Sequence, residues 1–393
     1  MNPRLPDAVC RQHTAHFGRP PQCMAYAPGR VEILGNHTDY NGGLTLSAAI
    51  DAGICAAVSR KSEPKANLLA MDLQAKSEFA LPVAGPPPPA AGEATQAWAN
   101  YILGVAQGLP IGAGTQGGFD LTFSGDIPRG AGLSSSAALE VAAALALAGL
   151  TGAQLPPLEL ARLCQRAENE FAGAQCGLLD QLSSLFGAEH ALVAIDFQSL
   201  AVKTIPLPGA SVFLIADTQV RHALVDSAYN DRRAQCEAAA RFCARALGRP
   251  IKNLRAVTMA EFRKIAPDMD PIAARRARHV LEENQRVQDA MAALQNGATA
   301  EFGRLMFASH HSSRDNFENS CPELDHLVDQ AKTLPAVIGA RLSGGGFGGS
   351  VVVMAPPAAA PAITAALQPG FQSRFHHPCA IRVIKPSAGA RLL

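Results

Sequence analysis

The sequence predicts an α+β protein of two domains, and three observations support this prediction. At 393 residues the chain is longer than one compact core allows, and its 48% apolar content is enough to fill two cores. Strand-like and helical runs alternate without the regular order of a parallel α/β sheet. A loop with Pro206 and Pro208 separates two buried strand-like runs, so we place the domain boundary at residue 207 and expect domains at 1–207 and 208–393.

Charge and cysteine content restrict the class of partner. The 34 basic and 33 acidic side chains nearly cancel, so we expect a small-molecule partner rather than nucleic acid or an anionic membrane. The nine cysteines form no C-x-x-C pair, which predicts reduced thiols and a cytoplasmic protein. The most apolar run, residues 137–150, is short and carries Glu140, so we expect no membrane span. A monomer is the default expectation, because no stretch marks an interface.

The first half of the chain combines strands with two helices. Apolar runs predict strands at residues 44–59, 119–126, 190–197 and 211–218. One helix is predicted from Ser134 to Leu150 and a second from Pro157 onward, with Leu160, Leu163 and Cys164 on one face of the second. We expect both helices to pack on the sheet.

The second half is mainly helical until its last quarter. A long helix is predicted at about residues 226–247, and further amphipathic stretches follow. Ser320 and Glu323 have the spacing of a capping box ahead of a helix whose apolar side carries Leu324, Leu327 and Val328. Near the end, a glycine-dense turn precedes a short apolar strand at residues 351–354.

The stretch "DIPRGAGLSSSAALEVA" predicts a phosphate cradle. Gly130 and Gly132 permit close backbone approach, and the serines open a strongly helical run whose first N–H groups face the loop. A plain strand end and helix cap is the alternative that these residues leave open. The stretch has neither the G-K-[ST] of a P-loop nor the spacing of a dinucleotide-binding loop.

Two further stretches carry candidate site residues. Glu168 and Asp180 lie in "RAENEFAGAQCGLLDQLSS", where the alternatives are a solvated helix residue and a helix N-cap. The run "SGGGFGGS" has five glycines in eight residues before a buried strand. Such density is typical of backbone that approaches another group closely, and a flexible hairpin is the alternative.

In this order the three stretches resemble a known family. The series "APGRVEILGNHTDYNGG", "PRGAGLSSSAALE" and "GGGFGGS" is similar to that of the GHMP small-molecule kinases, and the first stretch resembles the galactokinase signature within that superfamily. Similar segments follow in sequence order, including "AENEFAGAQCGLLDQ", "FGRLMFASHHSSRDNFENSCPELD" and "KPSAGA". The resemblance covers nearly the whole chain, roughly residues 28–390.

The resemblance implies a fold and a reaction. It implies an N-terminal ribosomal-protein S5-like domain, a C-terminal ferredoxin-like domain, an active site in the cleft between them, and ATP-dependent phosphorylation of the C1 hydroxyl of galactose. Asp180 matches the catalytic aspartate, and Arg30 matches its partner beside the transferring phosphoryl group. An adjacent arginine favours the ionised aspartate, so we expect Asp180 to orient the sugar hydroxyl and to accept its proton late.

The same matching implies three sets of binding residues. The cofactors are ATP and Mg²⁺, a hard cation that prefers oxygen ligands and that would be bound by Ser136 and Glu168. The triphosphate would be lined by Gly130, Gly132, Ser134, Ser135 and Ser136. The sugar pocket would comprise Arg30, Asn36, His37, Asp39, Gly177, Asp180 and Tyr229.

Within the implied sugar pocket, Asp39 is expected to accept hydrogen bonds from neighbouring hydroxyls, and His37 and Tyr229 to add a donor or acceptor each. Without the resemblance, His37 reads as a loop histidine and Tyr229 as an aromatic on a helix surface. Residues 344–349 are expected to shape the site rather than to supply chemistry.

Asn36 is a departure from the family, because galactokinases usually have a glutamate at this position, on the side of the sugar's exocyclic carbon. Asparagine keeps an acceptor, loses the charge and gains a donor. A glutamate would repel a C6 carboxylate 4 Å away by about 4 kcal/mol at an effective dielectric near 20. Galacturonate, or another galactose derivative, is therefore an alternative substrate. We rank galactose first, because the stretch has no additional Arg or Lys to pair with a carboxylate.

A non-catalytic sensor of sugar and ATP is a hypothesis from another class. An intact set of catalytic residues distinguishes an enzyme from such a sensor. Arg30, Ser136, Glu168 and Asp180 are all present, so the sequence favours the enzyme.

Overall fold

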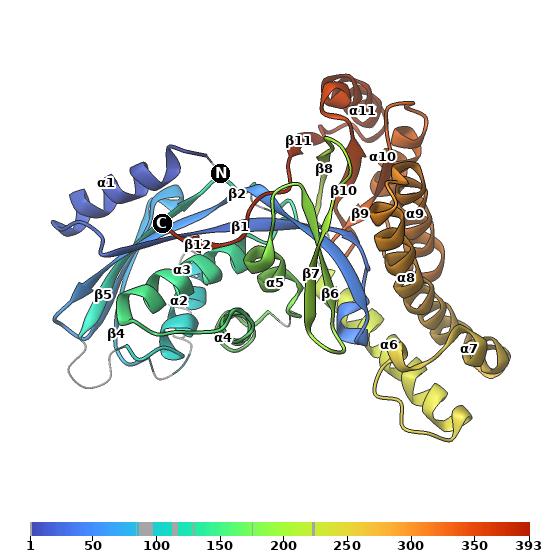
Figure 1. Ribbon diagram of the computed structural model, residues 1–393, viewed down its shortest axis with the longest axis horizontal. Coiled ribbons are helices and arrows are strands. Elements are labelled where there is room, and N and C mark those ends of the chain that lie inside the picture. The colour runs from blue at the N-terminus through green and yellow to red at the C-terminus, as the bar shows by residue number, and fades with distance from the viewer. Residues whose placement is uncertain are drawn as a thin grey trace.

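The strands form two sheets covered by helices, which confirms the α+β prediction (Figure 1). The computed structural model describes residues 2–83, 85, 97–111, 117–128, 130–174, 176–221 and 225–393. Two long antiparallel strands, β1 (Cys23–Leu34) and β2 (Leu44–Lys61), cross most of the view in Figure 1 and connect its two halves. The residues that follow β1 therefore lie where the two halves meet.

The first sheet has the strand order β12-β1-β2-β5-β3-β4, and β6 pairs with β2 and β7. The β3–β5 pair is parallel, whereas β2 pairs with β1, β5 and β6 in the antiparallel direction. The strands predicted at residues 44–59, 119–126 and 190–197 are confirmed within a few residues. Besides β1 and β2, the sheet contains β3 (Lys65–Ala70), β4 (Ala75–Ala80), β5 (Gly118–Gly125), β6 (Ala191–Asp196), β7 (Ala201–Pro206) and β12 (Arg391–Leu392).

Helices cover both faces of this sheet. Helix α1 (Leu5–Phe17) packs on β2 and β5, and α3 (Ser135–Thr151) packs on β1 and β2 from the other side, beside α2 (Ala97–Gln107) (Figure 1). The expectation that the second predicted helix also packs on the sheet is wrong. Helix α4 (Pro157–Arg166) packs on α2, α3 and α5 (Leu179–Phe186) instead. Because α3 is apolar on nearly all sides, it forms a middle layer between the sheet and α4.

The second sheet has the order β11-β8-β10-β9 and is antiparallel. Its strands are β8 (Val212–Arg221), β9 (Gly339–Ser343), β10 (Gly348–Ala355) and β11 (Ala380–Ile384). The glycine-dense turn predicted before a strand connects β9 to β10. Helices α10 (Pro322–Lys332) and α11 (Ala360–Phe375) pack on this sheet.

The remaining helices form the right-hand side of Figure 1. They are α6 (Val225–Leu247), α7 (Met259–Ile265), α8 (Pro271–Gln295) and α9 (Thr299–Ser312). Helices α8 and α9 pack side by side; α9 also packs on β9, and α8 contacts β1, β2 and β7 of the first sheet. Helix α8 thus reaches from the second half of the chain to the end of β1.

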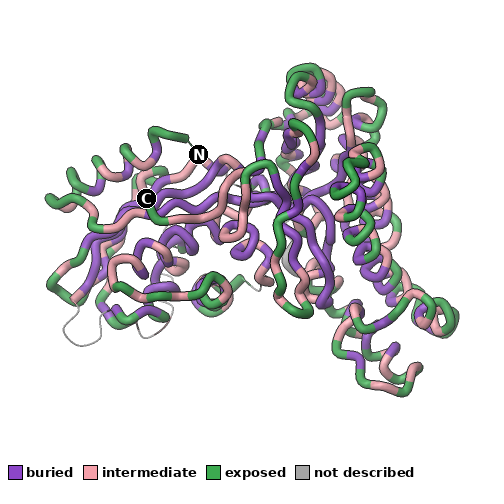
Figure 2. Tube along the Cα trace, viewed as in Figure 1, coloured by how far each residue is buried: buried purple, intermediate pink, exposed green. Residues whose placement is uncertain are grey.

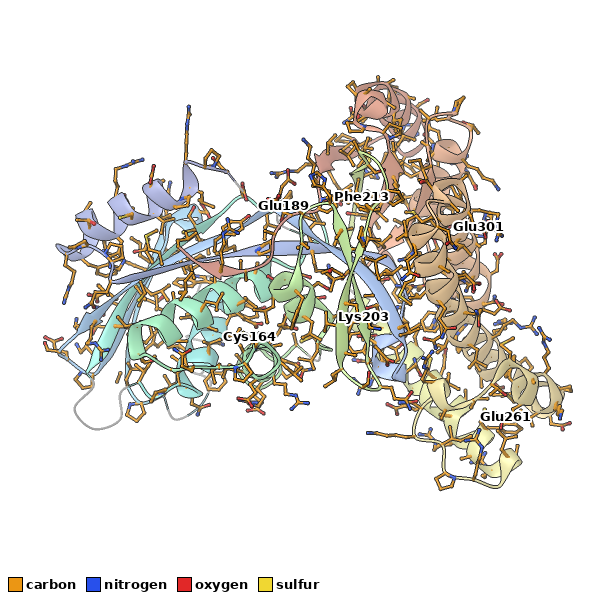
Figure 3. All side chains as sticks on the ribbon, viewed as in Figure 1. Cys164, Glu189, Lys203, Phe213, Glu261 and Glu301 are labelled. Carbon is orange, nitrogen blue, oxygen red and sulfur yellow. The ribbon has the colours of Figure 1, made fainter. Side chains whose placement is uncertain are left out.

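The hydrophobic core is continuous between the two halves. Although the sheets divide between β7 and β8, near the predicted boundary at residue 207, one buried cluster joins Val31 and Leu46 of the first sheet to Phe213 and Val352 of the second. Figure 2 shows buried backbone along both sheets, and Figure 3 labels Phe213 within this region. The division into domains at residue 207 stays a prediction, and the shared core favours a rigid connection between the two sheets.

The capping box predicted at Ser320 and Glu323 is wrong. Helix α10 begins one residue after Cys321, and no side chain caps it. The Ser320 hydroxyl donates to Asp325 Oδ1 at 2.5 Å instead, because this aspartate faces back over the helix start. The predicted apolar side is confirmed, since Leu324, Leu327 and Val328 are fully buried.

The C-terminal residues return to the first sheet. Ser387 donates through its N–H to Ala49 O at 2.9 Å and through its hydroxyl to Ile50 O at 2.6 Å. The N–H groups of Gly389 and Ala390 donate to Gly187 O and Ser184 O, both at 2.8 Å. The tail therefore holds the C-terminal end of α5 against β2. Among the described helices, none combines the length and apolar character that a membrane crossing requires.

Truncation after Pro386 is expected to lower the free energy of unfolding by about 2–5 kcal/mol, because each lost hydrogen bond contributes about 1 kcal/mol. Urea denaturation measures this change. The control is Leu393→Ala, a substitution at a half-exposed side chain, with an expected effect of about 0.5 kcal/mol or less. A truncated chain as stable as the full chain would show that the tail does not support α5.

Candidate active site

A cavity of about 210 Å³ lies where β1, α5 and the glycine-dense turn meet. All seven residues predicted for the sugar pocket line it. The full lining is Arg30, Glu32, Asn36, His37, Asp39, Cys176, Gly177, Leu179, Asp180, Tyr229, Gly344 and Gly345. The structure thus brings together four segments that are far apart in the sequence, and Gly344 and Gly345 enter from the second sheet as expected.

Local backbone geometry turns the chain into the cavity after β1. Gly35 has a φ of 98°, and a Cβ there would lie 2.5 Å from Leu44 O, so this position requires glycine. His37 also adopts a positive φ of 57°. A short 3₁₀ turn, Asp39–Asn41, then leads back into β2. The loop consequently presents Asn36, His37 and Asp39 to one space.

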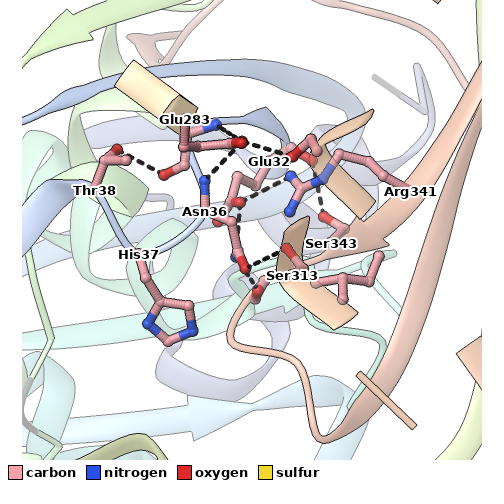
Figure 4. A network of polar contacts seen from close by, with 12 residues as sticks. Glu32, Asn36, His37, Thr38, Glu283, Ser313, Arg341 and Ser343 are labelled. Carbon is pink, nitrogen blue, oxygen red and sulfur yellow. Dashed lines mark hydrogen bonds and ion pairs between the residues drawn. The ribbon is translucent and has the colours of Figure 1, made fainter. Parts of the chain in front are cut away.

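Helix α8 fixes the start of this loop (Figure 4). The carboxylate of Glu283 accepts hydrogen bonds from Gly35 N at 2.9 Å and from Asn36 N at 3.4 Å, and His279 Nε2 donates to Asn36 O at 3.0 Å. Burial on its own raises the pKa of Glu283, but the positive charge of Arg286, 2.6 Å away, outweighs it and holds this pKa well below its usual range. The loop backbone is therefore anchored to a buried, ionised carboxylate.

Arg30 and Asp180 form a direct ion pair. Arg30 Nε and Nη2 both lie 2.7 Å from Asp180 Oδ1, and Arg30 Nη1 donates to Gly132 O at 2.6 Å. The Ser134 hydroxyl donates to Asp180 Oδ2. Asp180 lies in the first turn of α5 rather than at its N-cap, which excludes the capping alternative. One arginine thus joins the end of the cavity to the candidate phosphate loop.

The loop before α3 has the geometry of an anion cradle. Gly130 and Gly132 have φ values of 72° and 71°, and Ser134 has a φ of 54°. No side chain caps the start of α3, because the Ser134 hydroxyl is directed to Asp180. The first N–H groups of this 17-residue helix are left for another acceptor.

Ser136 and Glu168 contact each other directly. The Ser136 hydroxyl donates to Glu168 Oε1 at 2.8 Å, and Cys176 Sγ and Gln181 Nε2 donate to Glu168 Oε2 at 3.0 and 2.9 Å. Glu168 is buried at the end of α4, in the π-helical turn Ala167–Ala172, which excludes the solvated-helix alternative. Burial, together with the negative charge of Asp180, raises the pKa of Glu168. Among the described residues no group of three His, Cys, Asp or Glu side chains is placed to hold a metal ion.

A second buried carboxyl lies behind Glu168. Glu140 is fully buried on α3 and accepts a hydrogen bond from Gln181 Nε2 at 3.2 Å. Burial, with the nearby Glu168 charge, raises the pKa of Glu140 to about 10, so this carboxyl is protonated at neutral pH. A neutral Glu140 therefore adds no negative charge beside Glu168.

Both ring nitrogens of His37 are engaged within the protein. Burial lowers the pKa of His37 to about 3, so the ring is neutral. Nε2 donates to Gly345 O at 3.0 Å, and Nδ1 therefore accepts from the Tyr40 hydroxyl at 2.9 Å. The ring lies 5.1 Å from that of Tyr229. His37 thus lines the cavity with its ring. Both ring nitrogens bond to protein groups, so the expected hydrogen bond from His37 to a ligand is not available.

Asp39 faces the cavity opposite Gly177. A Cβ at Gly177 would lie 2.6 Å from Asp39 Oδ2, so a larger residue at this position would displace the carboxylate. Burial in the wall, with the charges of Glu32 and Asp180 nearby, raises the pKa of Asp39 to about 6. Asp39 is therefore ionised at neutral pH, but a fall of about one pH unit protonates half of it.

A second cavity of about 350 Å³ adjoins the candidate phosphate loop. Aromatic side chains line it, together with Ser135 and Ser136 at the start of α3. The aromatic residues are Trp98, Tyr101 and Phe123. A flat apolar group attached to a bound phosphate would fit this space.

Sequence reasoning missed several residues of the site. Glu32 lines the cavity, Gln181 and Cys176 hold Glu168, and Glu283 anchors the sugar-pocket loop. Glu32 gave a signal, because a charged residue stood within the strand-like run of β1. Glu283 gave none, since it lies in an ordinary charged helix and reaches the loop only through the fold.

Comparison with known families gives three matches along the chain. A model described as the galactokinase galactose-binding signature matches residues 11–60, the GHMP kinases N terminal domain matches residues 100–188, and the GHMP kinases C terminal model matches residues 290–371. These models follow one another in the order of the sequence and together cover more than half of the chain.

Solved structures with similar folds include a galactokinase from Lactococcus lactis complexed with galactose. It is 29% identical, with a TM-score of 0.89, over 98% of this chain and 99% of that one. A mevalonate kinase from Methanococcus jannaschii is 19% identical, with a TM-score of 0.61, over 92% and 98% of the two chains. A homoserine kinase from Cytophaga hutchinsonii is 18% identical, with a TM-score of 0.58, over 94% and 97%. The last two show the fold alone.

Glu283→Gln is expected to lower the free energy of unfolding by about 3–5 kcal/mol, because it leaves the Arg286 charge without its buried partner. The matched control is Glu282→Gln, the neighbouring glutamate, which lies 3.6 Å from the same arginine with 35% of its side chain exposed. Its expected effect is about 1 kcal/mol or less. Urea denaturation of both variants measures the difference, and equal effects would exclude Glu283 as the anchor of the loop.

Proposed function

The chain belongs to the GHMP kinases, in their galactokinase branch, and from this membership we propose that its 210 Å³ cavity binds galactose for phosphorylation by ATP at the C1 hydroxyl. The observation that carries the proposal is the Arg30–Asp180 ion pair, which lies between the sugar-pocket residues and the phosphate loop. The similar Lactococcus lactis galactokinase was crystallised with galactose, which supports the choice of sugar.

Asp180 is the group that handles the proton of the sugar hydroxyl in this proposal. Arg30 fixes Oδ1, while Oδ2 accepts from the Ser134 hydroxyl, a contact that the incoming C1 hydroxyl would replace. Since little proton removal is needed early in a loose phosphoryl-transfer transition state, Asp180 orients the hydroxyl and accepts its proton late. Arg30 offsets negative charge on the transferring phosphoryl group.

The residues around α3 suit a nucleotide triphosphate with its cation. The phosphates would bind to N–H groups of the loop that contains Gly130, Gly132, Ser134, Ser135 and Ser136. Ser136 Oγ and Glu168 Oε1 supply two oxygen donors, and a cation would favour the ionised form of a carboxylate that burial otherwise disfavours. Bound Mg²⁺ would neutralise charge on the phosphates. The adenine would occupy the aromatic cavity at Trp98 and Phe123.

The alternatives raised by the sequence gain no support from the site. A non-catalytic sensor has no need for the paired Arg30 and Asp180, which are in direct contact. The case for galacturonate rested on the lost charge at Asn36, but a carboxylate, Glu32, lies beside this residue in the cavity wall. We therefore keep galactose as the substrate.

We also propose a reducing, cytoplasmic setting, which the nine free cysteines support. The monomeric state stays a prediction.

Asp180→Asn is expected to lower kcat about 1,000-fold or more, because it removes the proton acceptor and the negative charge that pairs with Arg30. Galactose-dependent release of ADP from MgATP measures turnover, and the circular dichroism spectrum checks the fold. The matched control is Asp329→Asn, on the exposed side of α10, with unchanged turnover. A folded Asp180→Asn enzyme with most of its activity would contradict the role of Asp180.

The affinity for galactose is expected to fall as the pH is lowered through about 6. Because the pKa of Asp39 is raised, the ionised acceptor predominates above this pH and the protonated form below it. The Michaelis constant for galactose, measured at saturating MgATP between pH 5 and 8, should rise about tenfold for each pH unit below the pKa. A constant Michaelis constant down to pH 5 would exclude Asp39 as the titrating sugar ligand.

A further inference from the structure

Asn36 has no hydrogen bond left for a ligand (Figure 4). Its Nδ2 donates to Glu32 Oε1 at 3.0 Å and to Gly344 O at 2.7 Å. Its Oδ1 accepts from Asn319 Nδ2 at 2.8 Å and from Ser313 Oγ at 3.3 Å. A side-chain amide offers two donor hydrogens and one oxygen with two lone pairs, so every position is occupied. Asn36 therefore connects the loop to the second half of the chain and has no hydrogen bond to offer the sugar.

Glu32 is the neighbouring group that can form a hydrogen bond with the sugar. This glutamate is 5% exposed and lines the cavity. Its Oε1 accepts from Asn36 and from Arg341 Nη1 at 2.9 Å. Among the described residues, Oε2 of Glu32 has no hydrogen-bond partner. One carboxylate oxygen is thus held by the protein, and the other is available to a ligand.

Glu32 is held in place by Arg341. The arginine is fully buried on β9. Among the described residues, Glu32 is its ion-pair partner. Removal of either partner would leave a buried charge without compensation, so the pair persists as a unit. The cavity wall therefore carries a carboxylate that Arg341 orients.

The position of Glu32 relative to Arg30 assigns it to one end of the sugar. The two residues lie two apart on β1, in regular register with Ala49 and Ser47 of β2, so their side chains share a face about 7 Å apart. Arg30 contacts Asp180, where the C1 hydroxyl reacts. In a hexopyranose, C1 and the carbon that bears the exocyclic C6 group flank the same ring oxygen. A sugar with C1 at Asp180 can therefore direct C6 along β1 to Glu32.

From these contacts we infer that Glu32, and not Asn36, determines which C6 substituent the enzyme accepts. Glu32 Oε2 accepts a hydrogen bond from a C6 hydroxyl and repels a C6 carboxylate. The carboxylate that galactokinases usually place at position 36 is supplied from position 32. This inference rests on the proposed function, since it specifies the substrate of the same cavity.

The rest of the cavity wall adds to the exclusion of anions. Asp39 and Asp180 also face the cavity. Among the described lining residues, Arg30 carries the positive charge. Its guanidinium already donates hydrogen bonds to Asp180 and to Gly132 O. Arg341 is paired to Glu32 itself. A sugar with a carboxylate at C6 would meet a negative wall without a free cation.

The experiment compares kcat/KM for galactose, 6-deoxygalactose and galacturonate at saturating MgATP. The wild-type enzyme should prefer galactose about 10-fold or more over 6-deoxygalactose, which lacks the C6 hydroxyl, and about 100-fold or more over galacturonate. In Glu32→Gln the preference over 6-deoxygalactose should fall to about 3-fold or less, and the preference over galacturonate should fall about 10-fold. Glu323→Gln, on α10, is the charge-matched control and should keep the wild-type ratios.

Because Glu32→Gln leaves Arg341 unpaired and can impair folding, the double variant Glu32→Gln with Arg341→Met is measured beside it. Wild-type ratios in either folded variant overturn the inference while galactose phosphorylation still stands. The inference is also overturned if the wild-type kcat/KM for galacturonate lies within about 3-fold of that for galactose, whatever the variants show. If the wild-type enzyme phosphorylates none of the three sugars, the proposed function fails, and the inference fails with it.

Discussion

The ion pair between Arg30 and Asp180 is the contact on which the site depends. It joins the middle of β1 to the first turn of α5, and the same guanidinium binds Gly132 O in the loop before α3. Such a charge-assisted contact is stronger and more directional than a neutral hydrogen bond. Three separate segments, of which the first and last are 150 positions apart, are thus held in one geometry. Phosphoryl transfer relies on such prior positioning more than on covalent chemistry.

The wall of the proposed sugar pocket depends equally on the second half of the chain. The loop after β1 is held by Glu283 and His279 of α8, and its Asn36 side chain bonds to Gly344, Ser313 and Asn319. The continuous core beneath these contacts leaves little freedom for the halves to separate there. The proposed sugar pocket and the contacts between the two halves of the chain therefore share one hydrogen-bond network.

The sequence predicted the fold class, several strands and, through the family resemblance, the seven sugar-pocket residues that line the cavity, because glycine-bearing motifs and apolar runs are local signals. Three kinds of feature escaped it. The position of α4 depends on the all-round apolar surface of α3, and the start of α10 depends on Asp325 attracting Ser320. The exhausted hydrogen bonds of Asn36 and the free oxygen of Glu32 depend on Arg341 and Asn319, about 300 positions away. Contacts between residues so far apart cannot be predicted from a single sequence.

In the proposed reaction, this cavity directs phosphoryl transfer from ATP to the anomeric hydroxyl of galactose. Phosphorus NMR of the reaction of galactose with MgATP tests it most directly, because the coupling of phosphorus to the sugar protons identifies the oxygen that carries the phosphate. With C1 at Asp180, we expect one sugar product, phosphorylated at C1, in equal amount to ADP. A product phosphorylated at C6, or ADP with inorganic phosphate and no sugar phosphate, would contradict this role of the cavity.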